Sequence, residues 1–307
     1  MTLKQTLDSS SRGAHAAVIT FTQLRTLVAV VEHGSIGAAA TQLWVTPSAV
    51  SAAVLALQRE VGVPLLVKDG RGIRVTAAGS VLARYARTVL GLVDEATRAA
   101  VAAEDPTTGR VRIAAVTTAA EQVLPGALAS FRRGYAGVGI DLEVAPRDRV
   151  WAMLAAHEAD VVIAGRPPPG TDGRVRGSRR NDLIVVAAPG VSADPTAVTW
   201  LVREPGSGTR ATTQSYLDDL DVVPQLLSLG SNGAVVAGAV AGLGMTLVAR
   251  DAVTRELAAG QLVTVDLPGT PLPRPWHLVT ASTAGATTEL LVTHLLARDF
   301  RPVGGDE

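Results

Sequence analysis

The stretch SIGAAATQLWVTPSAVSAAVLALQREVG, residues 35–62, decides the fold of the first part of the chain. From Ile36 to Leu43 its apolar residues recur every three or four positions, the spacing of one face of a helix. The segment Trp44-Val45-Thr46-Pro47 interrupts this pattern. Pro47 suits the first turn of a second helix, whose apolar face extends to Gly62. Two helices joined by so tight a turn predict a helix-turn-helix, centred on residues 36–55.

Regular structure is also predicted on both sides of this stretch. The apolar residues that follow Phe21 recur at helical spacing, which predicts a first helix. Strands are predicted at 63–67 and 73–75, because an Asp-Gly turn at 68–72 separates two apolar runs. Thr76 then caps a long alanine-rich helix from about 77 to 103. The beginning of the chain shows no periodicity, and we expect a flexible tail there.

Hydroxyl and basic side chains gather where a helix-turn-helix meets double-stranded DNA. In such a motif the first residues of the second helix face base edges in the major groove; here they are Thr46, Pro47, Ser48 and Ser51. Between Phe21 and Arg87 seven basic residues outnumber three acidic ones, although the whole chain balances 28 against 28. Three of the seven lie in the hairpin, where a wing would reach phosphates: Lys68, Arg71 and Arg74. The alternative is a three-helix core with a solvated basic hairpin.

Composition excludes several other classes of protein. Cysteine is absent, which removes disulfides, thiolate metal sites and thiol redox chemistry. No secretory signal pattern opens the chain. The one uncharged stretch that resembles a membrane span, 233–249, is broken by glycines, which favours a helix followed by a buried strand. We expect a soluble, cytoplasmic protein with no membrane partner.

The second part of the chain alternates between strand and helix patterns. This alternation favours parallel sheets. The strands are too many for one compact sheet, which predicts two linked α/β lobes with a cleft between them. Strands are predicted at 111–116, 139–144, 160–164, 183–188, 199–202, 225–229, 244–248, 261–265 and 275–281. Helices are predicted near 120–134, 148–157, 208–219, 232–241, 251–257 and 285–298.

Three of these helices open with hydroxyl or amide side chains. Helix N-termini bind carboxylates and phosphates through their free amides. The residues at the three starts are Thr117 and Thr118; Ser207, Gly208 and Thr209; and Ser231 and Asn232. Arg166, at a strand end, adds positive charge. These eight residues are the predicted effector-binding set; the alternative is that the polar side chains only cap their helices.

An enzymatic function is not predicted. The five histidines are scattered, without the spacing of metal ligands. There is neither a dinucleotide-binding fingerprint nor a P-loop, and Gly206-Ser207-Gly208 lacks the outer glycines of a nucleophile elbow. We therefore expect no catalytic residues, no metal and no cofactor.

Residues 21–96 resemble the N-terminal domain of LysR-type transcriptional regulators. The resemblance rests on FTQLRTL at 21–27, VTPSAVS at 45–51, EVGVPLL at 60–66, GRG at 70–72 and RVT at 74–76. It implies that the helix 77–103 pairs with a second copy in an antiparallel coiled coil, giving a homodimer or homotetramer. One departure concerns base readout, because the family usually carries an arginine just after the serine matching Ser51, where this chain has Ala52 and Ala53.

The resemblance continues from Gly109 to about Phe300, matching the family's effector-binding domain, a two-lobed fold similar to periplasmic binding proteins. Thr117-Thr118-Ala119, Gly165-Arg166-Pro167-Pro168 and residues 203–210, REPGSGTR, look most similar to regulators of carbon-fixation operons. The implied fold brings the three helix starts to one cleft, where a small, anionic effector would bind. A solute-binding protein without DNA-regulatory activity is the alternative. The domains expected are a tail, 1–18; a winged helix-turn-helix, 19–76; a dimerisation helix, 77–108; an effector domain, 109–300; and a tail, 301–307.

Overall fold

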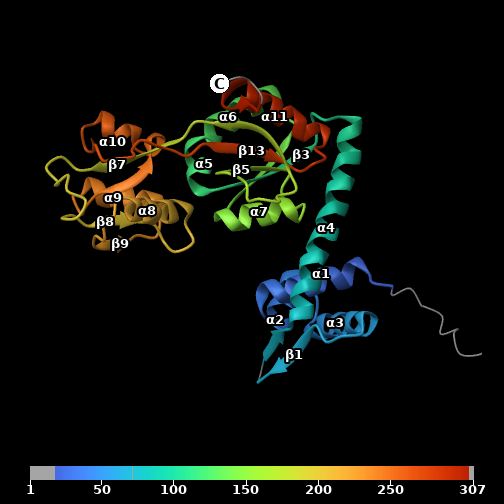
Figure 1. Cartoon of the computed structure of the whole chain (residues 1–307). Coiled ribbons are helices and arrows are strands. Elements are labelled where there is room, and N and C mark those ends of the chain that lie inside the picture. The colour runs from blue at the N-terminus through green and yellow to red at the C-terminus, as the bar shows by residue number, and fades with distance from the viewer. Residues whose placement is uncertain (1–17, 71, 304–307) are drawn as a thin grey trace, which may run out of the picture. The chain divides into compact units, whose positions relative to one another are not determined.

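The computed structural model describes residues 18–70 and 72–303, which form two compact units divided between Asp94 and Glu95 (Figure 1). The predicted tail before Val18, the predicted wing residue Arg71 and the last four residues lie outside the described residues. The division falls inside one long helix, α4 (Ala77–Glu104). Each unit is described by itself.

The first unit is a three-helix motif followed by a hairpin and the start of α4. Its elements are α1 (Phe21–His33), α2 (Ile36–Leu43), α3 (Pro47–Val61), β1 (Leu66–Asp69) and β2 (Gly72–Val75). Hydroxyl side chains cap the second and third helices: those of Ser35 and Thr46 accept the amides of Ala38 and Ala49. Pro47 occupies the first turn of α3 as expected.

The hairpin is held against α3 and α4 by a small set of polar contacts. The side-chain oxygen of Gln58 accepts the amides of Leu65 and Leu66, at 2.8 and 2.9 Å. Thr76 donates its hydroxyl to the Pro64 carbonyl and accepts the amide of Gly79, which confirms the predicted cap of α4. Leu66 and Ile73 of the hairpin then pack on the core of the three helices.

These contacts explain why the first strand of the hairpin begins later than predicted. The pattern placed it at 63–67, but the structure begins it at Leu66. Pro64 has no amide to give to a strand ladder, and the amide of Leu65 is bound by Gln58. The paired strands are therefore displaced toward the tip, at Gly70.

The second unit opens with a lobe, lobe 1, built on a six-stranded sheet. Its strands lie in the order β14-β6-β13-β5-β3-β4. They are β3 (Arg110–Ala115), β4 (Gly139–Val144), β5 (Val161–Ala164), β6 (Arg174–Arg179), β13 (Trp276–Thr280) and β14 (Arg301–Pro302). Its helices are α5 (Thr117–Gln122), α6 (Leu124–Gly134), α7 (Arg147–Ala155) and α11 (Ala286–Arg298).

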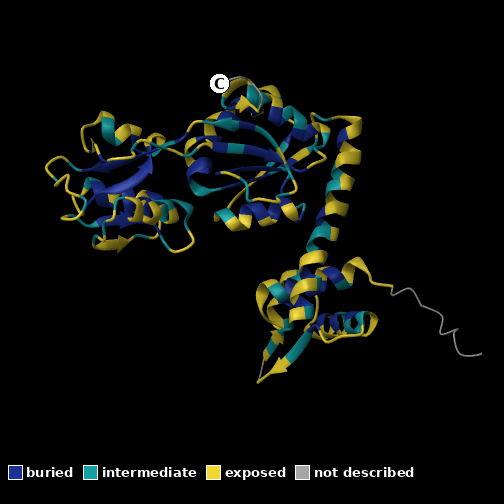
Figure 2. Ribbon diagram, in the orientation of Figure 1, coloured by how far each residue is buried: buried dark blue, intermediate teal, exposed yellow. Residues whose placement is uncertain are grey.

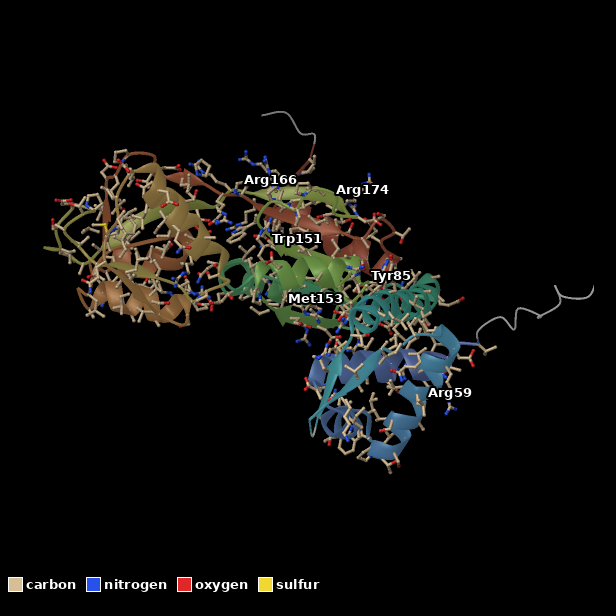
Figure 3. The ribbon with its side chains drawn as sticks, turned by 60° about the horizontal axis from the view of Figure 1, so that its bottom comes forward. Arg59, Tyr85, Trp151, Met153, Arg166 and Arg174 are labelled. Atoms are coloured by element: carbon tan, nitrogen blue, oxygen red, sulfur yellow. The ribbon has the colours of Figure 1, made fainter. Side chains whose placement is uncertain are left out.

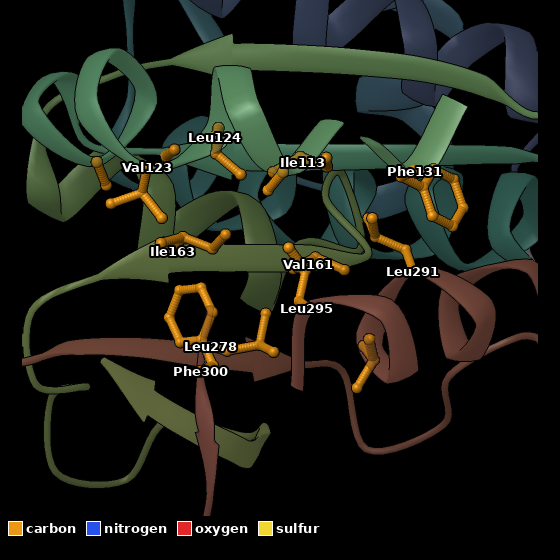
Figure 4. Close-up of a cluster of buried hydrophobic side chains, with 14 of the residues drawn as sticks. Ile113, Val123, Leu124, Phe131, Val161, Ile163, Leu278, Leu291, Leu295 and Phe300 are labelled. Atoms are coloured by element: carbon orange, nitrogen blue, oxygen red, sulfur yellow. The ribbon is translucent and has the colours of Figure 1, made fainter. Parts of the chain in front are cut away.

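Strict alternation along the central strands divides the interior of lobe 1 into two layers. Ile113, Val161, Ile163 and Leu278 face α6 and α11, as the close-up in Figure 4 shows. The intervening strand residues face α7, where Trp151 and Met153 lie (Figure 3). All four residues of β5 are buried for this reason, since both faces of the sheet are covered (Figure 2).

Lobe 2 has the same layered construction around β7. Its strands are β7 (Asp182–Ala187), β8 (Trp200–Val202), β9 (Leu226–Ser228), β10 (Thr246–Ala249), β11 (Val263–Val265) and β12 (Leu272–Pro273). Its helices are α8 (Gly208–Asp219), α9 (Asn232–Val240), η1 (Arg250–Val253) and α10 (Thr254–Ala258). One face of β7 packs with α8 and the other with α9.

The expectation of parallel sheets is correct for only part of this unit. Strand β3 pairs in parallel with β4 and β5, and β8 with β9. Strand β13 is antiparallel to β5 and β6, and β7 is antiparallel to β10, β11 and β12. The cause is that the chain crosses from lobe 1 to lobe 2 and later returns, so that β13 enters the first sheet in the opposite direction.

Three strands were missed, and one predicted helix is divided. Strand β6 contains three arginines and a glycine, a composition typical of a solvated loop. Strand β14 lies in the predicted tail, and β12 has only two residues. The helix predicted near 120–134 is divided into α5 and α6 at Val123.

The end of α4 is fixed to lobe 1 by a polar cluster. Glu95 binds Nδ1 of His157 at 2.6 Å, and Arg98 forms an ion pair with Asp160 at 3.0 Å. Arg112 of β3 binds the same Asp160 at 2.9 Å. Because these side chains are mostly shielded from water, the pairs fix the helix end more firmly than exposed pairs would.

Among the described residues, no single helix is both long and apolar enough to cross a membrane. Helices α2 and α3 taken together satisfy such a test by length and composition only, and they are bent by 106° at the break between them.

Gly79 offers a test of the contact between α4 and the hairpin. A Cβ added there would collide with the carbonyl oxygen of Leu65, so Gly79→Ala should lower Tm by several degrees, despite the better helix propensity of alanine. Gly37→Ala is the matched control, because no atom lies within 4 Å of that added Cβ. It should raise Tm slightly; equal Tm values for the two variants would contradict this account.

Candidate functional site

The start of α3 presents a small hydroxyl surface. Thr46, Ser48 and Ser51 are all exposed. Thr46 and Ser48 share a hydrogen bond of 2.9 Å, and Ser51 donates to the carbonyl of Pro47. Thr46 directly precedes the helix, Pro47 and Ser48 lie in its first turn, and Ser51 begins the second turn. Their hydroxyls and the free amides of the helix start can serve both phosphates and bases.

The wing divides its basic side chains between two faces. Cross-strand pairing places Lys68 opposite Ile73, on the face that packs toward the core, and Arg74 opposite Val67, on the other face. Arg74 lies 3.6 Å from Asp69 in an exposed ion pair. The sequence predicted these residues as one basic cluster; the structure shows that Lys68 and Arg74 point to opposite sides.

A cavity of about 250 Å³ lies between the lobes of the second unit. Its floor is formed where β3, β4 and β5 end, which is where open α/β sheets bind ligands. Lobe 2 contributes the starts of α8 and α9. The polar and charged residues that line it are Thr117, Thr118, Arg147, Asn181, Arg203, Glu204, Ser207, Thr209, Asn232 and Arg274.

The start of α8 is placed in this cavity by a tight turn. The amide of Ser207 binds the carbonyl of Glu204, with Pro205 and Gly206 between them and φ at 87° for Gly206. This is the arrangement of a type II turn, in which glycine supplies the positive φ. Arg274 donates to the carbonyl of Gly208 at 2.9 Å. A guanidinium therefore lies beside the free amides of the first turn of α8.

Two arginines leave the cavity with an excess of positive charge. Arg203 and Glu204 neutralise each other through two hydrogen bonds of 2.7 and 2.8 Å, which lower the pKa of Glu204. Arg147 donates to the Arg166 carbonyl, and its nearest carboxylate, Asp148, lies 3.7 Å away in solvent. No carboxylate in the described part of the chain pairs with Arg274. Burial, and then the charge of Arg147, lower the pKa of Arg274.

The cavity is bordered by the two segments that cross between the lobes. Asn181 lies between β6 and β7, and Arg274 lies between β12 and β13. The amide of Arg274 donates to the carbonyl of Asn181 at 2.8 Å, and the Asn181 side chain donates to the Arg274 carbonyl at 2.9 Å. These bonds join the two crossings into one hinge, so Arg274 belongs to the hinge as well as to the cavity.

Six of the eight predicted effector-binding residues line this cavity: Thr117, Thr118, Ser207, Gly208, Thr209 and Asn232. The structure does not bring the other two to it. Ser231 is exposed and caps α9 by accepting the amide of Ala234, as the alternative interpretation held. The Arg166 side chain is exposed at the end of β5 (Figure 3), and its carbonyl accepts a hydrogen bond from the lining residue Arg147.

Arg147, Asn181 and Arg274 were missed. Arg147 lies three residues after the end of the strand predicted at 139–144, and the carboxyl ends of parallel strands are where such sheets bind ligands, so the signal was present. Nothing local distinguishes Asn181 or Arg274, which meet only because the chain crosses twice between the lobes.

Comparison with known proteins agrees with this arrangement. Residues 104–299 match the model of the LysR substrate binding domain, and residues 21–80 match that of the bacterial regulatory helix-turn-helix protein of the lysR family. The regulator CbbR of Rhodospirillum rubrum is 34% identical over 266 residues, covering 84% of this chain and 88% of its own length. A RuBisCO operon transcriptional regulator of Acidithiobacillus ferrooxidans is 31% identical over 270 residues, covering 85% and 87%.

Among solved structures, the regulatory domain of CcmR from Synechocystis PCC6803, in complex with 2-PG, superposes with a TM-score of 0.56. It is 25% identical and covers 61% of this chain and 96% of its own. The two family models together account for both units, which a solute-binding protein without a DNA-binding domain would not. The chain therefore belongs to the LysR family of DNA-binding transcriptional regulators, with an effector-binding domain, in the branch that includes RuBisCO operon regulators.

Proposed function

We propose that this regulator binds a small phosphorylated or carboxylated metabolite between the lobes and thereby controls a carbon-fixation operon. One observation carries the proposal: Arg147 and Arg274 line the same cavity, where Arg274 pairs with no carboxylate of the described residues and the only carboxylate partner of Arg147 among them, Asp148, lies in solvent. Two like charges held together in a partly desolvated site are costly until an anion binds between them.

The remaining lining residues suit the same ligand. The first amides of α8 have no partner within the helix and lie beside Arg274. Ser207, Thr209 and Asn232 surround them with hydroxyl and amide groups, and Thr117 and Thr118 add hydroxyls from lobe 1. A guanidinium with a helix start is a common cradle for phosphate and carboxylate. The cavity lies just below the usual range of about 300–1,000 Å³ for drug-sized ligands, which favours a compact metabolite.

The relatives support the same class of ligand and target. A relative 31% identical bears the name of a RuBisCO operon regulator, and the CcmR regulatory domain was solved with 2-PG bound. We carry over to this chain only the class of ligand, a small anion, and not the exact molecule, and we assign it to the cavity between the lobes.

On DNA, the start of α3 provides base readout and the wing provides phosphate contacts. We assign base readout to Ser48 and Ser51, with Thr46 and Pro47 at the helix start, and phosphate contacts to Lys68, Arg71 and Arg74. Ala52 and Ala53 offer no hydrogen bond to a base edge, so the hydroxyls carry a larger share of the discrimination. We assign the protein to the cytoplasm, where bacterial DNA lies, and we propose a regulatory and not a catalytic role for it.

Self-association is assigned to α4. One face of the helix within the first unit leaves large apolar side chains in solvent, which include Val81, Tyr85, Val89 and Leu92 (Figures 2 and 3). Such a stripe at helical spacing is expected to pair with the same stripe of a second copy.

The ligand site can be tested by thermal shift with inorganic phosphate, glycolate, 2-phosphoglycolate and 3-phosphoglycerate. A ligand that binds only the native state raises Tm. We expect a phosphorylated acid to raise Tm of the wild type, and Arg147→Gln and Arg274→Gln each to abolish the shift.

Arg166→Gln is the matched control, because its side chain lies outside the cavity while the carbonyl that Arg147 binds is unchanged. It should keep the full shift. Loss of the shift in Arg166→Gln, with retention in the other two variants, would reverse the assignment of the cationic residues.

The two DNA roles can be separated by titrating the operator at several salt concentrations. Ser48→Ala should change the ranking of operator variants while leaving the salt slope intact. Lys68→Ala should weaken binding to all sequences and lower the slope by about one. Equal, sequence-independent losses in the two variants would contradict the division of roles.

The pairing of α4 can be tested at one position. Leu92→Glu should shift the molecular mass measured by light scattering toward the monomer, because it buries a charge in the apolar stripe. Leu92→Met is the control, since it keeps volume and hydrophobicity and should keep the oligomer. An unchanged mass for Leu92→Glu would exclude this face as the interface.

A further inference from the structure

Trp44, in the turn between α2 and α3, is the feature of the first unit that its own fold does not explain. Its side chain is 94% exposed, the largest exposure of an aromatic residue among the described residues. The other three tryptophans are at most 9% exposed. In the described part of the chain, no hydrogen bond is formed by the indole Nε1 of Trp44, whereas that of Trp200 binds the Pro195 carbonyl.

The backbone at Trp44 also conflicts with its side chain. With φ at 57° and ψ at 39°, the residue ends α2 in the left-handed conformation, and its amide caps the helix on the carbonyls of Ala40 and Thr41. Glycine or asparagine usually occupies this position, because a Cβ is strained there. The ends of α1 and α3, by contrast, use Gly34 and Gly62.

Trp44 is a bulky apolar residue in a strained backbone conformation, and it gains no packing contact in return. A residue that lowers the stability of the fold in this way indicates a functional role. The position of Trp44 in the motif indicates what its side chain contacts.

Trp44 lies two residues before the N-cap of α3, Thr46, and therefore borders the hydroxyl surface. In a docked helix-turn-helix the first helix crosses the DNA backbone and the second lies in the major groove. The turn between them therefore passes over a sugar–phosphate strand.

We propose that Trp44 is a DNA-contacting residue that holds α3 at the edge of the major groove. Its ring packs on the deoxyribose of the strand that the turn crosses, and its Nε1–H donates to a phosphate oxygen. The ring supplies apolar area and the indole a single donor, the combination that a sugar–phosphate surface accepts. The proposal rests on DNA binding by the helix-turn-helix and assigns it a residue outside the recognition helix and the wing.

This contact has a distinct thermodynamic signature. Because the indole is neutral, it releases no counterion, so its loss lowers affinity without changing the salt slope. Because sugar and phosphate are the same in every sequence, operator and non-specific DNA lose affinity by the same factor. A base-reading residue would alter the ratio between them, and a cationic residue would alter the slope.

The first experiment titrates full-length wild type, Trp44→Ala, Trp44→Phe and Trp44→Gly with operator and non-specific DNA. We expect Trp44→Ala to weaken both about tenfold with an unchanged salt slope, and Trp44→Phe to lose less because it keeps a ring. Trp44→Gly should lose affinity equally while its Tm stays the same or rises, because glycine removes the backbone strain. A fall in DNA affinity without a fall in Tm distinguishes a lost DNA contact from a damaged fold. Val223→Ala, which removes a fully exposed apolar side chain of the second unit, is the control and should bind as wild type.

The second experiment uses the exposed indole as a probe. Acrylamide should quench a wild-type component that is missing in Trp44→Phe, because the other three tryptophans are buried. Operator DNA should protect that component and leave the spectrum of Trp44→Phe unchanged.

Unaltered affinity of Trp44→Ala, together with an indole that stays accessible in the complex, would overturn the proposal. Normal DNA binding with loss of transcription activation would overturn it as well and assign the residue to a protein partner. Failure of the wild type to bind the operator would instead refute the DNA-binding role itself.

Discussion

The two-way hydrogen bonding between Asn181 and Arg274 is the contact on which the sensing half of the molecule depends. Each lobe has a covered sheet and its own core, but only two short segments join them. Strands β6 and β13 pair on one side of these segments, and β7 and β12 pair on the other. The Asn181–Arg274 bonds carry the same antiparallel pairing across the gap. The lobes are therefore connected by one continuous ribbon and not by two independent linkers, which restricts their relative motion to bending and twisting of that ribbon.

The DNA-binding half depends on a comparable group of hydrogen bonds at the base of the wing. One side-chain oxygen, that of Gln58, binds two adjacent amides of the wing, and Thr76 fixes the opposite strand end to the start of α4. These bonds set the wing relative to α3, the two elements that meet DNA. A buried amide left without its hydrogen-bond partner lowers the stability of the fold by about 1–3 kcal/mol. These bonds therefore fix the position of the wing relative to α3 more firmly than the small apolar core alone would.

The sequence predicted best what is encoded locally. Apolar period and proline placement within a few residues determine α2 and α3, whose bounds were found almost to the residue, and the same period located α1 after Phe21. Helix starts in the sensing half were found for the same reason, and six of their residues line the cavity. Strand β6 was missed because its arginines resemble a solvated loop; in the structure Arg176 and Arg179 are bound by Glu289, Asp251 and Asp299 from elsewhere in the fold. Arg147 and Arg274 lie 127 positions apart in the sequence, and only the double crossing between the lobes brings them to one site. Trp44 was missed because a bulky residue in a left-handed turn follows no propensity rule.

The position of Arg274 on the ribbon, opposite Arg147 of lobe 1, has a consequence for how ligands would be distinguished. The two guanidinium groups repel each other across an empty or neutral-filled cavity, and this repulsion contributes to the lowered pKa of Arg274. An anion between them would turn the repulsion into attraction. A neutral molecule of the same shape would gain nothing from either guanidinium group and would leave their repulsion in place. The site would therefore select its ligand by charge as well as by shape.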